Sequence, residues 1–289
     1  MLASVISLID GSGPSESALD AAARLAVRAS LSLHGLFIED ERQFTYFPPV
    51  TAMGVGLGTA PTVAVPLPAD EYARVEREVR GLRERAEESF QRRCAAHDIH
   101  GRFQSTRGDV IDEMIVAARR NGLVVMGCRR RGAPEGATNP GSKIEPLLRA
   151  TPRPLLLTPE GTWMDEAGGT VMLAYDGSTA ALRALPLAGW MAQLFGSSVE
   201  VVVVEDDKER LQLLHEEAFA YLEPYGMEIT QTSQCGRAWK RLVHLAEQRQ
   251  TRCMVMGAFG HYRISEWIFG STTTNVLEHL PCPVLLTRP

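Results

Sequence analysis

The chain has 289 residues, of which 45% are hydrophobic and 22% are charged, so two domains of ordinary size could each bury a core. Its net charge of −5 provides no cationic excess to neutralise a phosphate backbone, which argues against a nucleic-acid partner. No run approaches the roughly 20 apolar residues of a membrane helix, and the first residues lack a signal-peptide pattern. The 5 scattered cysteines contain no Cys-x-x-Cys pair, which predicts a reduced, cytoplasmic setting.

Two parts of the chain repeat each other. Residues 4–12 parallel residues 170–178, with Asp10 matching Asp176 at an offset of 176 − 10 = 166. Further on, Gly127 matches Gly257 at an offset of 257 − 127 = 130, so the first copy carries about 36 extra residues between its second and fourth strands. The sequence therefore predicts a tandem duplication with domains at 1–158 and 170–289 and a linker at 159–169.

The first copy alternates short β-branched runs with stretches of helical period. Its expected strands are 5–9, 31–38, 101–106, 123–126 and 155–158, and its clearest helices are 15–29, 71–96 and 110–120. The insertion at 40–70 is rich in Pro and Gly and has no helical period, and the charged helix after it is expected to be a solvated face.

The second copy repeats this plan more compactly. Its strands are expected at 171–175, 198–205, 228–232, 253–256 and 283–287, and its helices at 180–195, 208–225, 238–248 and 272–280. Strands that alternate with helices imply right-handed βαβ units and a mostly parallel sheet covered on both faces. The predicted fold is therefore two repeated doubly wound, Rossmann-like α/β domains of five strands each.

A glycine pattern follows the strand that ends at Gly257. Gly260 comes three residues later and Gly270 ten residues after that, which gives Gly-x2-Gly-x9-Gly-Ser between a strand and a helix. Glycine lets the backbone approach a ligand closely. The hydroxyl run at 271–273 stands where free N–H groups at a helix N-terminus favour phosphate. The pattern predicts a nucleotide site.

Residues at the ends of neighbouring strands are expected to face the same crevice, because ligands lie beyond the carboxyl ends of parallel strands. Asp176 could bind ribose hydroxyls or a phosphate-bound Mg²⁺, or it could simply open an Asp-Gly-Ser turn. Val204 would pack on an adenine ring or serve as a core valine. His261 would contact phosphate or lie in a solvated loop.

The second copy resembles the ATP-binding members of the universal stress protein family. The residues that match their spacing are Met256, Gly257, Gly260, Gly270 and Ser271. The resemblance implies a fold like that of the adenine nucleotide α-hydrolases, ATP with Mg²⁺ as ligand, and a role in stress tolerance through nucleotide-dependent signalling or interaction. The expected binding residues are Ala174, Tyr175, Asp176, Val204, Met256, Gly257, Gly260, His261, Gly270, Ser271, Thr272 and Thr273, with no catalytic residue and no metal cluster.

The first copy departs from the pattern. Arg130 stands where the second glycine is expected, and Gly141 falls fourteen residues after Gly127 rather than thirteen. A side chain at position 130 would crowd a phosphate, although the three arginines at 129–131 could bind an anion by charge or form a solvated basic loop. A degenerate site is expected here.

Two other functions are compatible with the sequence. An ATP hydrolase of the same fold would need a residue to position water at the γ-phosphate, for which Asp176 and His261 are the candidates. A nucleotide-free interaction module would use the glycines only to shape a loop. The apolar final strands at 155–158 and 284–287 are expected to pair within the chain, because a bare apolar edge associates and the short linker raises their effective concentration. A homodimer of chains is also left open.

Overall fold

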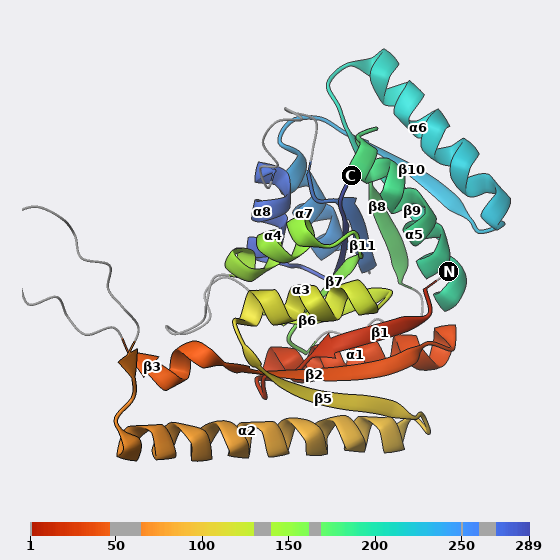
Figure 1. The fold of residues 1–289 in the computed structure, drawn as a ribbon. Coiled ribbons are helices and arrows are strands. Elements are labelled where there is room, and N and C mark those ends of the chain that lie inside the picture. Colours follow the sequence, from red (N-terminus) through yellow and green to blue (C-terminus); the bar gives the residue numbers. More distant parts are fainter. Residues whose placement is uncertain (1, 47–64, 130–139, 162–168, 250, 260–269) are drawn as a thin grey trace, which may run out of the picture.

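The computed structural model describes residues 2–46, 65–129, 140–161, 169–249, 251–259 and 270–289 (Figure 1). Within these ranges the main sheet has ten strands in the order β10-β9-β8-β11-β12-β7-β6-β1-β2-β5. All neighbours in this sheet are parallel except the central pair, β12 and β7, which is antiparallel. The strands β1 to β7, with their helices, are called the first half below, and β8 to β12 the second half.

The first half supplies five strands of the main sheet. They are β1 (Ser4–Leu8), β2 (Ser32–Asp40), β5 (Gly101–Gly108), β6 (Leu123–Cys128) and β7 (Leu155–Pro159). The helices are α1 (Gly13–Ala29), α2 (Ala69–Ala96), α3 (Val110–Arg120) and α4 (Pro140–Ala150). In the insertion, a 3-10 helix (Glu41–Phe44) leads into the small antiparallel pair β3 (Thr45–Tyr46) and β4 (Val65–Pro66).

The second half supplies the other five strands in the same relative order. They are β8 (Thr170–Ala174), β9 (Val199–Val204), β10 (Ile229–Gln234), β11 (Thr251–Gly257) and β12 (Val284–Thr287). The helices are α5 (Thr179–Phe195), α6 (Lys208–Leu222), α7 (Ala238–Gln248) and α8 (Ser271–His279). The mostly parallel, doubly wound α/β fold expected from the sequence is confirmed.

The first helix of each half starts at a serine for the same reason. The Ser12 hydroxyl accepts a hydrogen bond from the backbone N–H of Ser15, and the Ser178 hydroxyl accepts one from Ala181. A side-chain oxygen at the N-cap satisfies an N–H group that has no partner inside the helix. The repeated Asp-Gly-Ser therefore places α1 and α5 identically after β1 and β8.

Helix α6 ends earlier than the sequence predicted. The period of apolar residues suggested a helix over 208–225, whereas the α-helix stops at Leu222 and a 3-10 turn (Glu223–Tyr225) follows. Pro224 has no backbone N–H and its ring crowds the preceding turn, so a regular helix cannot continue through it.

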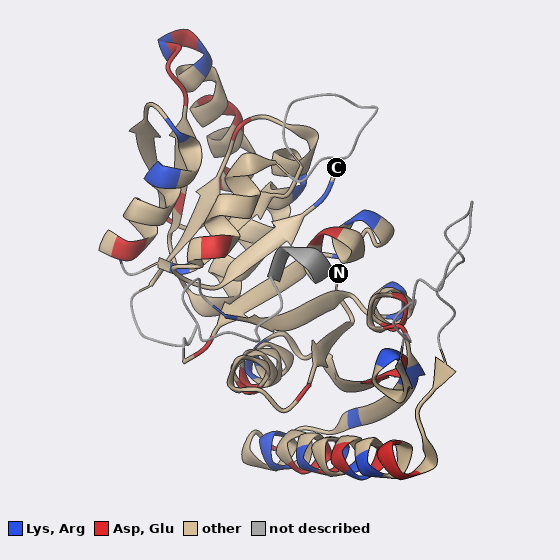
Figure 2. Cartoon of the chain, turned by 90° about the vertical axis from the view of Figure 1, so that its left-hand side faces the viewer, with Lys and Arg blue, Asp and Glu red and all other residues tan. Residues whose placement is uncertain are grey.

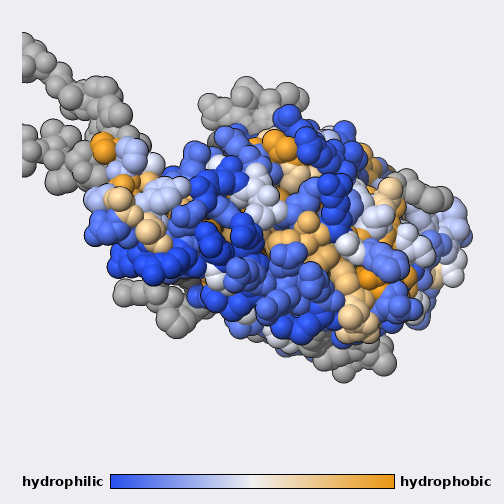
Figure 3. Space-filling model, turned by 60° about the horizontal axis from the view of Figure 1, so that its bottom comes forward, coloured by the Kyte–Doolittle hydropathy of each residue, from blue (hydrophilic) through white to orange (hydrophobic). Residues whose placement is uncertain are grey.

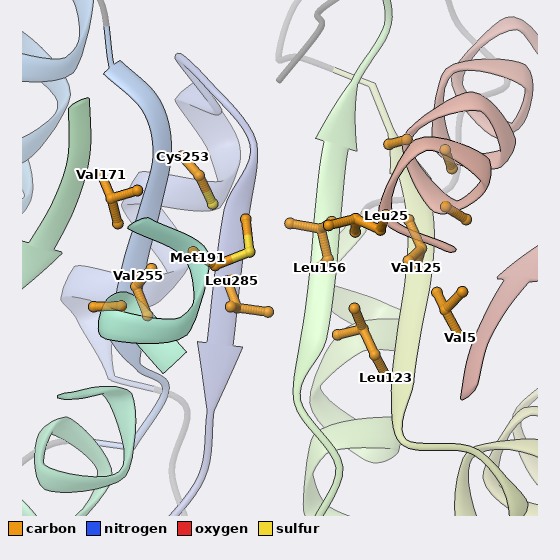
Figure 4. Close-up of a cluster of buried hydrophobic side chains, with 14 of the residues drawn as sticks. Val5, Leu25, Leu123, Val125, Leu156, Val171, Met191, Cys253, Val255 and Leu285 are labelled. Atoms are coloured by element: carbon orange, nitrogen blue, oxygen red, sulfur yellow. The ribbon is translucent and has the colours of Figure 1, made fainter. Parts of the chain in front are cut away.

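The core lies in two layers, one on each face of the sheet. Figure 4 shows part of one layer, with Leu25 of α1 close to Leu156 of β7 and Met191 of α5 close to Leu285 of β12. Because the sheet runs unbroken through both halves, this layer also joins residues of both halves in one cluster. Among the described residues, no helix is long and apolar enough to cross a bilayer.

The prediction that the two final strands pair within the chain is confirmed. Strands β7 and β12 are antiparallel neighbours in which Leu156 lies opposite Leu285. Both side chains are buried, at 0% and 1% exposure. The pairing removes the two apolar edges that isolated halves would present, since an unpaired edge strand is a template for association.

Candidate functional site

The strand order of the second half reverses between β8 and β11. From β8 the chain continues outward through β9 and β10 on one side, and then returns to β11 and β12 on the other. The carboxyl ends of these two strands, Ala174 and Gly257, therefore flank the topological switch point. In open α/β sheets, ligands bind in the crevice outside such a point.

Asp176 opens a turn at this crevice. Its Oδ1 accepts a hydrogen bond from the backbone N–H of Ser178 at 3.0 Å. Gly177 has a φ of +72°, in the left-handed region that favours glycine. Asp10 makes the same contact to Ser12 at 2.9 Å in the first half. The turn role is thus observed, and the exposed Asp176 side chain follows the carboxyl end of β8 by two residues.

Gly257 has a packing role that requires no ligand. A Cβ on this residue would lie 2.7 Å from the Cβ of Ala180 and 2.9 Å from the carbonyl carbon of Ala180. In the first half, a Cβ on Gly127 would overlap the backbone of Pro14. Each glycine lets the end of a strand touch the first turn of the helix that follows the Asp-Gly-Ser turn. These two glycines are explained by the fold alone.

We expect Gly257→Ala to lower the free energy of unfolding by about 1–3 kcal/mol, the usual cost of overpacking a tight contact. Gly81→Ala is the matched control, because Gly81 lies inside α2 with only the tip of Arg85 near, at 3.4 Å. Removing a helical glycine there should raise stability by about 0.5–1 kcal/mol. Urea denaturation followed by circular dichroism measures both. Equal and small changes in the two variants would contradict the packing role of Gly257.

Helix α8 begins at the crevice without a side-chain cap in the described structure. Its N-cap is Gly270, with φ −60° and ψ 142°, and no described side chain accepts a capping hydrogen bond from its first N–H groups. By contrast, α1 and α5 are capped by serines. Ser271 is exposed and Thr272 partly so. The N–H groups of this turn and the helix dipole together favour an anion.

Thr273 serves the fold rather than the crevice. Its side chain is 2% exposed, and its hydroxyl donates a hydrogen bond to the carbonyl oxygen of Ala258 at 3.0 Å. This bond ties the first turn of α8 to the residue just after β11. Because the Thr273 hydroxyl already donates to Ala258, the group of Thr273 left for the expected phosphate contact is its backbone N–H.

The other expected site residues divide between the two faces of the sheet. Ala174, Val204 and Met256 pack with the buried cluster that includes α7 and α8. Tyr175 points to the opposite face, where its ring lies in the cluster that contains Leu214 of α6. The Tyr175 side chain is buried, and burial raises the pKa of its phenol, so this side chain is neutral. Only its backbone remains a candidate contact.

Two expected residues, Gly260 and His261, lie outside the described residues, as does Arg130 of the first half. The described part of the chain contains no group of three or more His, Cys, Asp or Glu residues arranged to hold a metal ion. The described polar groups of the candidate site are therefore Asp176 and the backbone at the end of β11 and the start of α8.

Comparison with known proteins identifies relatives of this chain. Residues 204–288 match the model of the universal stress protein family. The chain is 28% identical over 168 residues to "Universal stress protein Slr1230" of Synechocystis, a match that covers 57% of this chain and 58% of that protein. The chain thus matches little more than half the length of this curated relative.

Solved structures extend the likeness to the whole chain. A universal stress protein from Archaeoglobus fulgidus is similar with a TM-score of 0.72 and 20% identity, over 99% of this chain and 98% of that one. A putative universal stress protein from Pseudomonas aeruginosa has a TM-score of 0.59 and 18% identity, over 100% and 94% of the two chains. At these identities the structures show a shared fold.

Proposed function

We propose that this chain, which belongs to the universal stress protein family, binds one ATP molecule at the carboxyl ends of β8 and β11. Its role would be stress tolerance through nucleotide-dependent signalling or interaction. The observation that carries the proposal is the start of α8, which lies just after the switch point and has no side-chain cap in the described structure. A phosphate is the natural partner of such N–H groups.

The rest of the nucleotide would extend from this point along the strand ends. Asp176, exposed just beyond the end of β8, suits the ribose hydroxyls or a Mg²⁺ ion carried on the phosphates. Mg²⁺ is commonly held by one or two carboxylates together with substrate phosphates, so the proposal needs no metal cluster made by the protein alone. Val204, partly buried at the end of β9, offers an apolar surface to the adenine ring.

Two observations bear on the alternative functions. Gly257 packs on Ala180, which explains this glycine without a ligand. This packing favours a nucleotide-free interaction module. For ATP hydrolysis, Asp176 is the one described candidate for positioning water, and it already accepts a hydrogen bond from Ser178. Mass spectrometry of nucleotide released from the purified protein tests the first alternative, and phosphate release from ATP with Mg²⁺ tests the second.

A cytoplasmic location also remains part of the proposal. All 5 cysteines of the chain are free thiols in the structure. Three of them are buried, and burial raises the pKa of Cys128 to about 12, so that thiol stays protonated and unreactive. Free thiols are usual in proteins of reducing compartments.

We expect one tight ATP site per chain, in the second half. The first half has arginine rather than glycine at position 130 and one extra residue before Gly141, so its sequence departs from the glycine spacing of the second half. Isothermal titration of the full chain with ATP and Mg²⁺ should give a stoichiometry near one. Two equivalent tight sites would contradict the proposed difference between the halves.

A further inference from the structure

A cavity of about 220 Å³ lies in the first half, away from the proposed ATP crevice. It opens between the carboxyl ends of β2 and β5 and the N-terminal part of α2, which Figure 1 shows running alongside β5. These strands are at the far end of the sheet from β8 and β11. The residues that line it are Glu39, Glu76, Val79, Arg80, Arg83 and Arg107.

A buried carboxylate organises the floor of this cavity. Glu39 is 7% exposed, and its two oxygens accept from different arginines. The Nη1 of Arg83 lies 3.2 Å from Oε1, and the Nε of Arg107 lies 2.9 Å from Oε2. A buried charge is tolerated when it is paired and hydrogen-bonded in this way. The negative charge of Glu39 is therefore paired with two arginines inside the protein.

Arg107 is held on three sides. Besides Glu39, it donates to the hydroxyl of Tyr72 at 3.2 Å, and its guanidinium carbon lies 4.2 Å from the centre of the Phe44 ring. Such a planar contact with an aromatic face orients a guanidinium. The guanidinium of Arg107 is therefore held in one orientation in the lining of the cavity.

The other two guanidiniums retain hydrogen-bonding capacity toward the cavity. Arg83 uses one nitrogen for Glu39, and its side chain is 38% exposed. Arg80 is exposed and forms no ion pair with any residue that the structure describes. Residues three apart are neighbours on a helix surface. The lining has three arginines and two carboxylates, which leaves an excess of one positive charge.

We propose that this cavity binds a small oxyanion, a phosphate or a carboxylate, through Arg80 and Arg83. Guanidinium groups recognise such anions with paired, charge-assisted hydrogen bonds. The volume is below the roughly 300–1,000 Å³ of pockets for drug-sized ligands, so an inorganic phosphate or a small dicarboxylate fits better than a whole nucleotide. Figure 3 shows that the surface on this side of the molecule is largely hydrophilic, which suits a polar ligand.

The test titrates inorganic phosphate, and separately succinate, into the full-length protein at low ionic strength by calorimetry. Gly270→Val serves as the background, so that phosphate bound at α8 does not contribute. We expect saturable binding of at least one anion, which identifies the ligand class. Arg80→Gln should weaken it several-fold, and Arg80→Gln with Arg83→Gln at least about tenfold, equivalent to about 1.4 kcal/mol.

Two further variants sharpen the result. Arg92→Gln is the matched control, because Arg92 is also an exposed arginine of α2 but does not line the cavity; its anion affinity should be unchanged. Glu76→Gln removes from the lining a negative charge that repels an anion, so the variant should bind the anion more tightly. Melting temperatures confirm that each variant is folded. Absence of saturable binding, or equal losses in Arg80→Gln and Arg92→Gln, would overturn the proposal whatever the outcome for ATP.

Discussion

Gly270→Val is expected to reduce ATP affinity at least about 100-fold. A valine side chain at the N-cap of α8 would occupy the space through which phosphate oxygens reach the N–H groups of the first turn. Losing two charge-assisted hydrogen bonds of about 1.5 kcal/mol each corresponds to roughly this factor. Gly270 has φ −60° and ψ 142°, a region open to any residue. The variant should therefore fold, with at most about 1 kcal/mol lost from a poorer cap.

The matched control for this variant is Gly141→Val at the corresponding position of the first half. It should leave ATP affinity unchanged, because the tight site is proposed to lie in the second half. Titration calorimetry with ATP and Mg²⁺ measures both variants. If Gly141→Val lost ATP and Gly270→Val retained it, the site would belong to the first half. Gly260→Val, which lies outside the described residues, is predicted from the glycine spacing to abolish binding as well.

Leu156→Ala and Leu285→Ala are each expected to lower the free energy of unfolding by about 2–5 kcal/mol, the range for a leucine truncated in a core. The two leucines lie opposite each other where β7 meets β12, and directly opposed side chains on antiparallel strands are in contact. The loss of unfolding free energy in the double variant should therefore differ from the sum of the two single-variant losses, by a coupling of about 0.5–3 kcal/mol. Urea denaturation followed by circular dichroism gives all three values.

A surface leucine supplies the control for these truncations. Leu213 of α6 is 63% exposed, so Leu213→Ala should change stability by no more than about 0.5 kcal/mol. Strict additivity of the two core variants would show that β7 and β12 are not neighbours in solution. In that case the halves would be joined by the linker alone, and a pair of cysteines at positions 156 and 285 would fail to cross-link within one chain.

Much of the fold could be predicted from the sequence because its signals are local. Helix α3 was expected at 110–120 and occurs there. Its boundary is set by Asp109, whose side chain accepts from the N–H groups of Ile111 and Asp112. The repeat of Asp-Gly-Ser after β1 and β8 indicated the same turn twice, since a glycine at positive φ and a serine cap are properties of neighbouring residues. Charged residues of both signs along α2, shown in Figure 2, also follow from the sequence alone.

The roles of several candidate site residues depended on contacts between distant segments. Gly257 reads as a ligand-binding glycine in the sequence, whereas its position against Ala180 arises only when β11 passes the start of α5. The hydroxyl of Thr273 donates a hydrogen bond to the carbonyl oxygen of Ala258. The ring of Tyr175 packs on the face of the sheet that α6 covers. A pattern of residue types indicates which groups are near a strand end, but strand pairing and helix packing decide which of them face the crevice.

The sequence by itself therefore determined the order of strands and helices along the chain, the duplication, and the glycine pattern that follows the strand ending at Gly257. Only the tertiary structure determined the cavity of the first half. Glu39 is 44 residues from Arg83 and 68 residues from Arg107, and no local period relates them. They meet because β2 pairs with β5 and α2 packs on both, and a buried carboxylate is tolerated when it is paired and hydrogen-bonded as Glu39 is.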